Sequence, residues 1–172
     1  MSKYNSIVPE DIASNTFDFH GASIEIDCDN IYPRYKPYMY FISRDGYDFP
    51  SSANTPPPHF VEIKSSSPLI IDRFDFMASW DLVYMTAKDY KIETSMDGET
   101  WDMVYSGTVP DTRVYTKECE FEPTICRYLK FTVLSTYDRR GYKWYQGGFM
   151  KVYGTLAGDM LYINQHAYAI PK

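Results

Sequence analysis

Aromatic, arginine and aspartate residues gather in three segments of this 172-residue chain, at residues 44–58, 78–89 and 135–146. The residues in them that we expect to contact a ligand are Asp48, Phe49, Trp80, Asp81, Arg139, Arg140, Tyr142, Trp144 and Tyr145. The C–H face of a pyranose stacks on an indole or phenol ring, while charged donors and acceptors bind its hydroxyl groups. The same residue types are over-represented at the energetic centres of protein interfaces. The set therefore suits either a sugar or a protein partner, and composition does not separate the two.

Each of these residues also has a purely structural interpretation. Packing in the core or at its rim explains Trp80 and Trp144 equally well. A solvated loop pair is the simpler interpretation of Arg139-Arg140.

Catalytic patterns are missing from the sequence. The histidines, His20, His59 and His166, are far apart, and no Cys/His metal spacing, G-x-S-x-G elbow or phosphate-binding loop occurs. A glycosidase would need two facing carboxylates, and no pattern singles out such a pair. We therefore expect a protein that is not an enzyme and has no catalytic residues.

The segments that must position the candidate residues have the pattern of short β-strands. Aromatic residues are abundant, with 17 Tyr and 10 Phe, and the 11 Pro and 9 Gly fall between apolar runs. The sequence predicts strands at 23–27, 38–43, 59–64, 69–77, 90–95, 101–106, 113–118, 127–134 and 148–153. Many short strands with turn residues between them predict an all-β fold, a jelly-roll β-sandwich.

The order of these strands predicts where the candidate ligand residues lie. If each strand from residue 59 onward crosses the sandwich once, the short turns at 65–68, 96–99 and 121–125 share one pole. The connections at 44–58, 78–89, 107–112 and 135–146 then share the opposite pole. Long loops on a rigid scaffold are the usual place for recognition, so we expect ligand binding at this long-loop pole.

Three motifs occur in order towards the end of the chain. Ser95, Asp97-Gly98 and Trp101 form a strand, a tight turn and the start of a return strand. Arg127-Tyr128-Leu129-Lys130 follows, and then Val152-Tyr153-Gly154. Together they resemble the discoidin, or coagulation factor 5/8 type C, family of galactose-binding-like β-sandwiches. The resemblance implies a binding domain that uses loops at one pole, with Trp101 in the core.

The chain departs from the calcium-binding members of that family. Asp45-Gly46 resembles the start of the calcium loop, but the expected T-x-W is replaced by a segment with three prolines, Pro56 to Pro58. Phe149 stands where the family has a glutamate ligand. Because calcium needs six or more oxygen ligands, we expect no calcium and no other cofactor. The departures also disfavour, less strongly, the family's galactose site. Trp80, Phe49 and Trp144 could act as membrane spikes, but the loops contain little lysine to meet anionic lipid.

Charge and cysteine content narrow the partners and the compartment. The net charge of −6 without a basic stripe argues against nucleic acid. The three cysteines, Cys28, Cys119 and Cys126, are expected to be reduced, although a Cys119–Cys126 cross-link over a hairpin is conceivable. The N-terminus has no apolar run typical of a secretory signal, so synthesis in a cytoplasm without export is expected.

The predicted organisation is an N-terminal arm at 1–20, a sandwich at 21–154 and a C-terminal tail at 155–172. Two functions are consistent with it. The first is a structural component of a virus or phage particle, assembled in the host cytoplasm, whose ends contact other subunits and whose loops could contact host glycans. The second is a stand-alone carbohydrate-binding, lectin-like module that uses the long-loop pole.

Overall fold

The computed structural model describes residues 2, 4–42, 55–77, 86–112, 116–137, 145 and 147–158. Its strands are β1 (Thr16–Phe19), β2 (Ala22–Cys28), β3 (His59–Met77), β4 (Asp89–Ser95), β5 (Asp102–Thr108), β6 (Thr116–Val133) and β7 (Gly148–Leu156). A single 3-10 turn within the described part, η1 (Pro37–Tyr40), follows β2. No helix among the described residues is long and apolar enough to cross a membrane.

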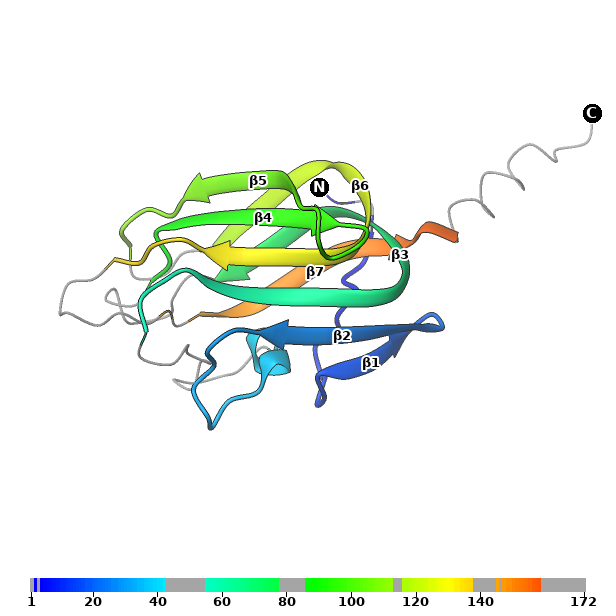
Figure 1. The fold of residues 1–172 in the computed structure, drawn as a ribbon, viewed down its shortest axis with the longest axis horizontal. Helices are drawn as coiled ribbons and strands as arrows, with labels where there is room; N and C mark the ends of the chain where they lie inside the picture. Colours follow the sequence, from blue (N-terminus) through cyan, green and yellow to red (C-terminus); the bar gives the residue numbers. More distant parts are fainter. Residues whose placement is uncertain are drawn as a thin grey trace, which may run out of the picture.

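All strands pair antiparallel, and β3 and β6 each contribute to two layers (Figure 1). The first half of β3 and the second half of β6 lie in a front sheet of order β1-β2-β3-β6-β4-β5. The second half of β3 pairs with β7 and with the first half of β6 in the back layer. The ladder between β3 and β6 is irregular between Lys64 and Leu69, where the strands bend from one layer to the other.

The core fills the space between the layers. In β2, buried Ile24 and Ile26 alternate with exposed Glu25 and Asp27, as a half-buried strand requires. Aromatic rings from both layers meet in the centre, where the centroid of Phe131 lies 5.2 Å from that of Phe74 and 4.7 Å from that of Phe76. Burying one such side chain contributes about 1.5–3 kcal/mol.

Several predicted elements differ from the structure. The strand expected at 38–43 is wrong, because Pro37 begins a 3-10 turn there; its fixed φ and missing N–H suit a first helical position. The strands expected at 59–64 and 69–77 are one strand, β3. No hairpin turn forms at Glu122-Pro123-Thr124, because β6 continues through it. Residues 121–123 have no partner on β3, so the missing N–H of Pro123 costs no ladder bond.

The N-terminal segment is built into the sandwich. Ile7, Val8 and Ile12 are buried in the core. The Ile7 N–H donates to the Val152 carbonyl at 2.7 Å, and the Gly154 N–H donates to the Asn5 carbonyl at 3.1 Å, so this segment lies beside β7. Since β1 also begins before residue 20, the segment expected to be an irregular arm is part of the fold. In the expected tail, β7 continues to Leu156 and residues 159–172 lie outside the described part.

Candidate functional site

The strand ends that border the long connections share one pole of the sandwich (Figure 1). In the front sheet Cys28 is opposite Val61, His59 is opposite Val133, and Val133 is opposite Tyr90. In the back layer Met77 is opposite both Thr116 and Gly148. This arrangement agrees with the long-loop pole that strand order predicts, although bends in β3 and β6 replace two of the expected turns.

Of the nine predicted ligand residues, the structure describes Tyr145. Asp48, Phe49, Trp80, Asp81, Arg139, Arg140, Tyr142 and Trp144 lie outside the described residues, and their role stays a prediction.

Tyr145 is the predicted site residue that the structure describes, and it lies in the core. Its side chain is 2% exposed. The ring stacks on Tyr40, with centroids 6.3 Å apart, and it also contacts Phe131. Burial raises the pKa of its hydroxyl. The expectation that Tyr145 contacts a ligand is therefore corrected, because its ring packs in the core against Tyr40 and Phe131.

A buried histidine joins β2 to the start of β3 at this pole. The His59 Nδ1 lies 3.1 Å from an Asp29 carboxylate oxygen, and Nε2 lies 2.9 Å from the Thr55 carbonyl. The other Asp29 oxygen accepts the Phe60 N–H at 2.5 Å. Burial alone would lower the pKa of His59, but these two acceptors outweigh it and the pKa is raised. The contacts hold the segment that enters β3 in one position.

A second polar cluster joins β4, β5 and the residues after β6. The Asp89 carboxylate accepts hydrogen bonds from the Ser135 hydroxyl at 2.6 Å and the Thr108 hydroxyl at 2.7 Å, which lower its pKa. The Tyr137 hydroxyl donates to the Val109 carbonyl at 2.7 Å. Together with the Asp29–His59 contacts, this cluster gives the connecting segments a rigid base.

Exposed side chains after β2 were not among the predicted site residues. Tyr32 is 48% exposed, and the Arg34 guanidinium lies 4.7 Å from the centre of the Tyr35 ring. The sequence signal was the aromatic and arginine content of Tyr32-Pro33-Arg34-Tyr35. Strand order does not indicate this segment, because it precedes the strands that define the long-loop pole.

Trp101 lies on the outer surface of the front sheet, so the expectation that it is a core residue is wrong. Its Nε1 donates to the Gly98 carbonyl at 3.1 Å, and its ring meets Tyr128 edge to face at 6.2 Å. The Lys130 Nζ lies 3.6 Å from the ring centre. The turn that precedes Trp101 is as predicted, because Gly98 has φ +79° and Asp97 accepts the N–H groups of residues 99 and 100.

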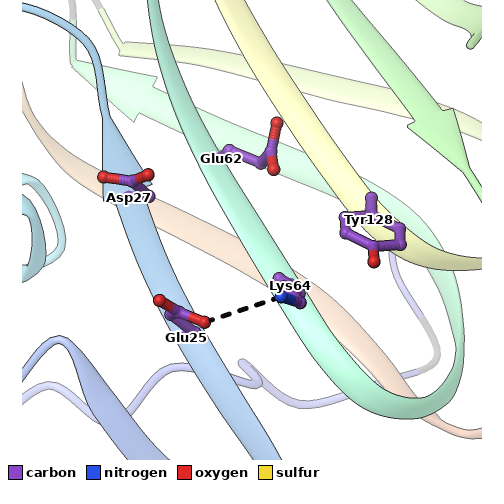
Figure 2. A pocket seen from close by; sticks show the side chains of 5 residues that line it. All are labelled: Glu25, Asp27, Glu62, Lys64 and Tyr128. Atoms are coloured by element: carbon purple, nitrogen blue, oxygen red, sulfur yellow. Dashed lines mark ion pairs between the residues drawn. The ribbon is translucent and has the colours of Figure 1, made fainter. Parts of the chain in front are cut away.

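A hollow of about 150 Å³ lies on the same outer face, where Tyr128, the ring that Trp101 contacts, lines it (Figure 2). It is lined by Glu25 and Asp27 of β2, Glu62 and Lys64 of β3, and Tyr128 of β6. No group of His, Cys, Asp or Glu side chains among the described residues is arranged to hold a metal ion. The expectation that the protein binds no calcium stays a prediction.

Comparison with known proteins gives consistent results at the level of family and fold. A family model described as F5/8 type C domain matches residues 36–146. CBM32-3 from a family 31 glycoside hydrolase of Clostridium perfringens is 22% identical, with a TM-score of 0.64, covering 77% of this chain and 91% of that one. CpGH89CBM32-5 from Clostridium perfringens, in complex with GalNAc-beta-1,3-galactose, is 12% identical, with a TM-score of 0.63, covering 76% and 94%.

The family 32 module of NanJ from C. perfringens, in complex with galactose, is 11% identical, with a TM-score of 0.61, covering 76% of this chain and 93% of that one. No curated protein matches the sequence. At these identities the solved structures establish the fold alone, and that fold is the galactose-binding-like β-sandwich expected from the sequence.

Proposed function

Because this chain belongs to the F5/8 type C domain family, we propose that it is a non-enzymatic domain that binds a glycan through its long-loop pole. The observation that carries the proposal is the extent of the family match. Residues 36–146 include the long connections of that pole and all nine predicted site residues. The His59 and Asp89 contacts hold together the described strand ends from which these connections leave. A rigid base of this kind suits loops that recognise a ligand.

The ligands to test first are glycans that contain galactose. Two of the structures with this fold are complexes with galactose and with GalNAc-beta-1,3-galactose. In this chain Trp80 and Trp144 supply rings for stacking on the sugar, while Asp48, Asp81 and the Arg139-Arg140 pair supply groups that bind hydroxyls.

The second candidate is a component of a virus or phage particle, assembled in the host cytoplasm, that docks on other subunits. The high tyrosine content, 17 of 172 residues, is the sequence feature that favours it. The described part of the N-terminal segment is used within the protein's own fold, so docking would depend on the C-terminal segment and the loops. None of the structures named above is a virus or phage component. Glycan binding is therefore the first function to test.

The test is a glycan array with the purified full-length chain, followed by titration of any glycan that binds. We expect Trp80→Ala and Trp144→Ala each to weaken binding, because an aromatic side chain at a binding centre contributes about 2 kcal/mol, roughly 30-fold in Kd. Trp101→Ala is the matched control, since it removes the same ring beside the Asp97-Gly98 turn, at the end of β4 that is away from the long connections. A folded chain that binds no glycan, or one for which all three variants bind equally, would refute the proposal. Oligomerisation in solution together with no glycan binding would favour the assembly role.

A further inference from the structure

A buried histidine joins the end of the 44–58 connection to the sandwich. His59 is the first residue of β3, and it is 3% exposed. The residues before it, Pro56 to Pro58, have no backbone N–H, so the Thr55 carbonyl cannot accept the hydrogen bond from residue 58 that closes an ordinary turn. The His59 Nε2 lies 2.9 Å from that carbonyl and takes the place of the missing donor.

The two contacts of this imidazole require its doubly protonated form. Nδ1 of His59 lies 3.1 Å from an Asp29 carboxylate oxygen, on the other side of the ring from Thr55. A carboxylate and a carbonyl are both acceptors, so each ring nitrogen must carry a hydrogen to bond its partner. A neutral imidazole carries only one hydrogen, and neither of its tautomers can make both contacts. The arrangement is therefore complete only while His59 is charged.

The groups around His59 leave the Asp29 carboxylate as its charged neighbour among the described residues. The residue opposite His59 on β6 is the apolar Val133. Cys28 of β2 and Tyr40 of η1 lie close enough to Asp29 to be affected by its charge, and burial raises the pKa of both groups, that of Cys28 to about 12. Both therefore stay neutral over the range in which a histidine titrates. Burial lowers the pKa of His59, but its two hydrogen bonds and the carboxylate charge raise it by more.

Loss of the proton breaks one particular contact. The Asp29 carboxylate stabilises a hydrogen on Nδ1, so neutral His59 keeps that hydrogen and presents the lone pair of Nε2 to the Thr55 carbonyl. Two lone pairs then face each other, and Thr55 is no longer held. Asp29 keeps its own position, because it accepts the Phe60 N–H at 2.5 Å and its N–H donates to the Phe60 carbonyl at 3.3 Å. The change therefore acts on the end of the 44–58 connection.

We propose that Asp29, His59 and Thr55 form a pH-sensitive switch, which fixes the end of the 44–58 connection while His59 is protonated and releases it when His59 is neutral. The inference rests on the proposed glycan-binding function and adds its regulation, because this connection contains Asp48 and Phe49, two of the predicted ligand residues. After release, only a fraction of the molecules has the connection in position, and the apparent Kd increases in inverse proportion to that fraction. Affinity for a glycan at the long-loop pole therefore decreases as pH rises.

The test is a titration of the purified full-length chain at a series of pH values from mildly acidic to mildly alkaline. The ligand is GalNAc-beta-1,3-galactose, or a neutral glycan that binds more tightly on the array. Neither has a group that titrates in this range, so a change in affinity comes from the protein. We expect the affinity to decrease about two- to tenfold as pH rises, the equivalent of one hydrogen bond. NMR spectra of the imidazole nitrogens should give His59 the same midpoint and, above it, a hydrogen on Nδ1.

Variants assign the pH dependence to this histidine. His59→Gln retains a neutral side-chain donor and has no charge to lose, so its affinity should not depend on pH. Asp29→Asn removes the charge that stabilises the imidazolium, so the midpoint should move to lower pH. His20→Asn and His166→Asn are the controls, because they replace the other two histidines of the chain and should retain the pH dependence of the wild type. Asparagine suits position 20, where φ is +52°.

The outcomes separate this inference from the proposed function. An affinity that is constant over the pH series overturns the inference and leaves the proposed function standing. The inference is also overturned if binding and His59 titrate with different midpoints, or if neutral His59 carries its hydrogen on Nε2, since the Thr55 contact would then survive. The wild-type series decides these points even if His59→Gln fails to fold. Absence of glycan binding at every pH refutes the proposed function, and the inference with it.

Discussion

Replacing Gly154 with alanine should destabilise the sandwich through a single close contact. Gly154 lies in β7 opposite Ile71, and its N–H donates to the Asn5 carbonyl of the N-terminal segment. A Cβ at this position would lie 2.4 Å from the Ile70 carbonyl oxygen and 2.9 Å from Ile7 Cδ1. Ordinary contacts begin near 3.4 Å, so the backbone of β3 and the buried Ile7 side chain must both move.

The expected cost follows from this geometry. Overpacking of a close-packed interior costs about 1–3 kcal/mol. Alanine recovers about 0.4–1 kcal/mol by restricting the unfolded chain, so the midpoints of the two ranges leave a net loss of about 1.3 kcal/mol. For a chain of this length each kcal/mol shifts Tm by about 2–4 °C, which gives a decrease of about 3–5 °C.

Thermal unfolding followed by circular dichroism measures this decrease. Gly158→Ala is the control, because nothing lies within 4 Å of a Cβ at that position, and its Tm should match that of the wild type. The double variant Ile7→Val/Gly154→Ala removes the contact with Cδ1 but retains the contact with the Ile70 carbonyl, so it should recover only part of the loss. A Gly154→Ala protein with the same Tm as the Gly158→Ala control would refute this reasoning.

Three further predictions concern titration and reactivity. The pKa of His59 is raised from its ordinary value of 6.5, so its contribution to stability is complete below pH 6.5 and is lost as pH rises through the folded pKa. Asp29→Asn should therefore flatten the dependence of Tm on pH between mildly acidic and alkaline conditions. Equal slopes in the variant and the wild type would contradict this. Backbone hydrogen bonds to Asp97 lower its pKa from 3.8 to about 2, so the stabilisation by this carboxylate is present above pH 3.8 and disappears as pH falls towards 2. Asp97→Asn should lower Tm at neutral pH, and the difference in Tm from the wild type should disappear in acid. A variant that only disrupts packing would keep the same difference at both pH values. Burial raises the pKa of Cys119 to about 11 and that of Cys126 to about 12, so neither thiol should react with a thiol reagent until the chain is unfolded with denaturant. Rapid labelling of these two thiols in the native protein would contradict this prediction.

The elements that were predicted well are those whose signal is local. Alternation of buried and exposed residues marks β2 and β4, and Asp97-Gly98 marks the turn after β4, because strand period and positive φ depend on a few adjacent residues. The three motifs around Trp101, Tyr128 and Gly154 sufficed to indicate the family, and the family match confirms it.

The misplaced features depend on partners far away in the sequence. Trp101 lies outside and Tyr145 inside, although both are large aromatic residues beside turns or loops, because the register of β6 decides which neighbours each ring meets. Ile7 is a core residue because its segment pairs with β7. The residues around it in the sequence are mostly polar, so no local pattern predicts its burial.

The sequence by itself thus determined the class of fold, the family, and the pole to which the long connections belong. Only the tertiary structure decided that β3 and β6 each contribute to both layers, and that Asp27, Glu62 and Tyr128 lie around one hollow. These residues come from three strands separated by long stretches of chain, and no local pattern encodes how such strands align. The register of the strands decides which side chains meet on that face, because it places one carboxylate opposite another and an aromatic ring beside them.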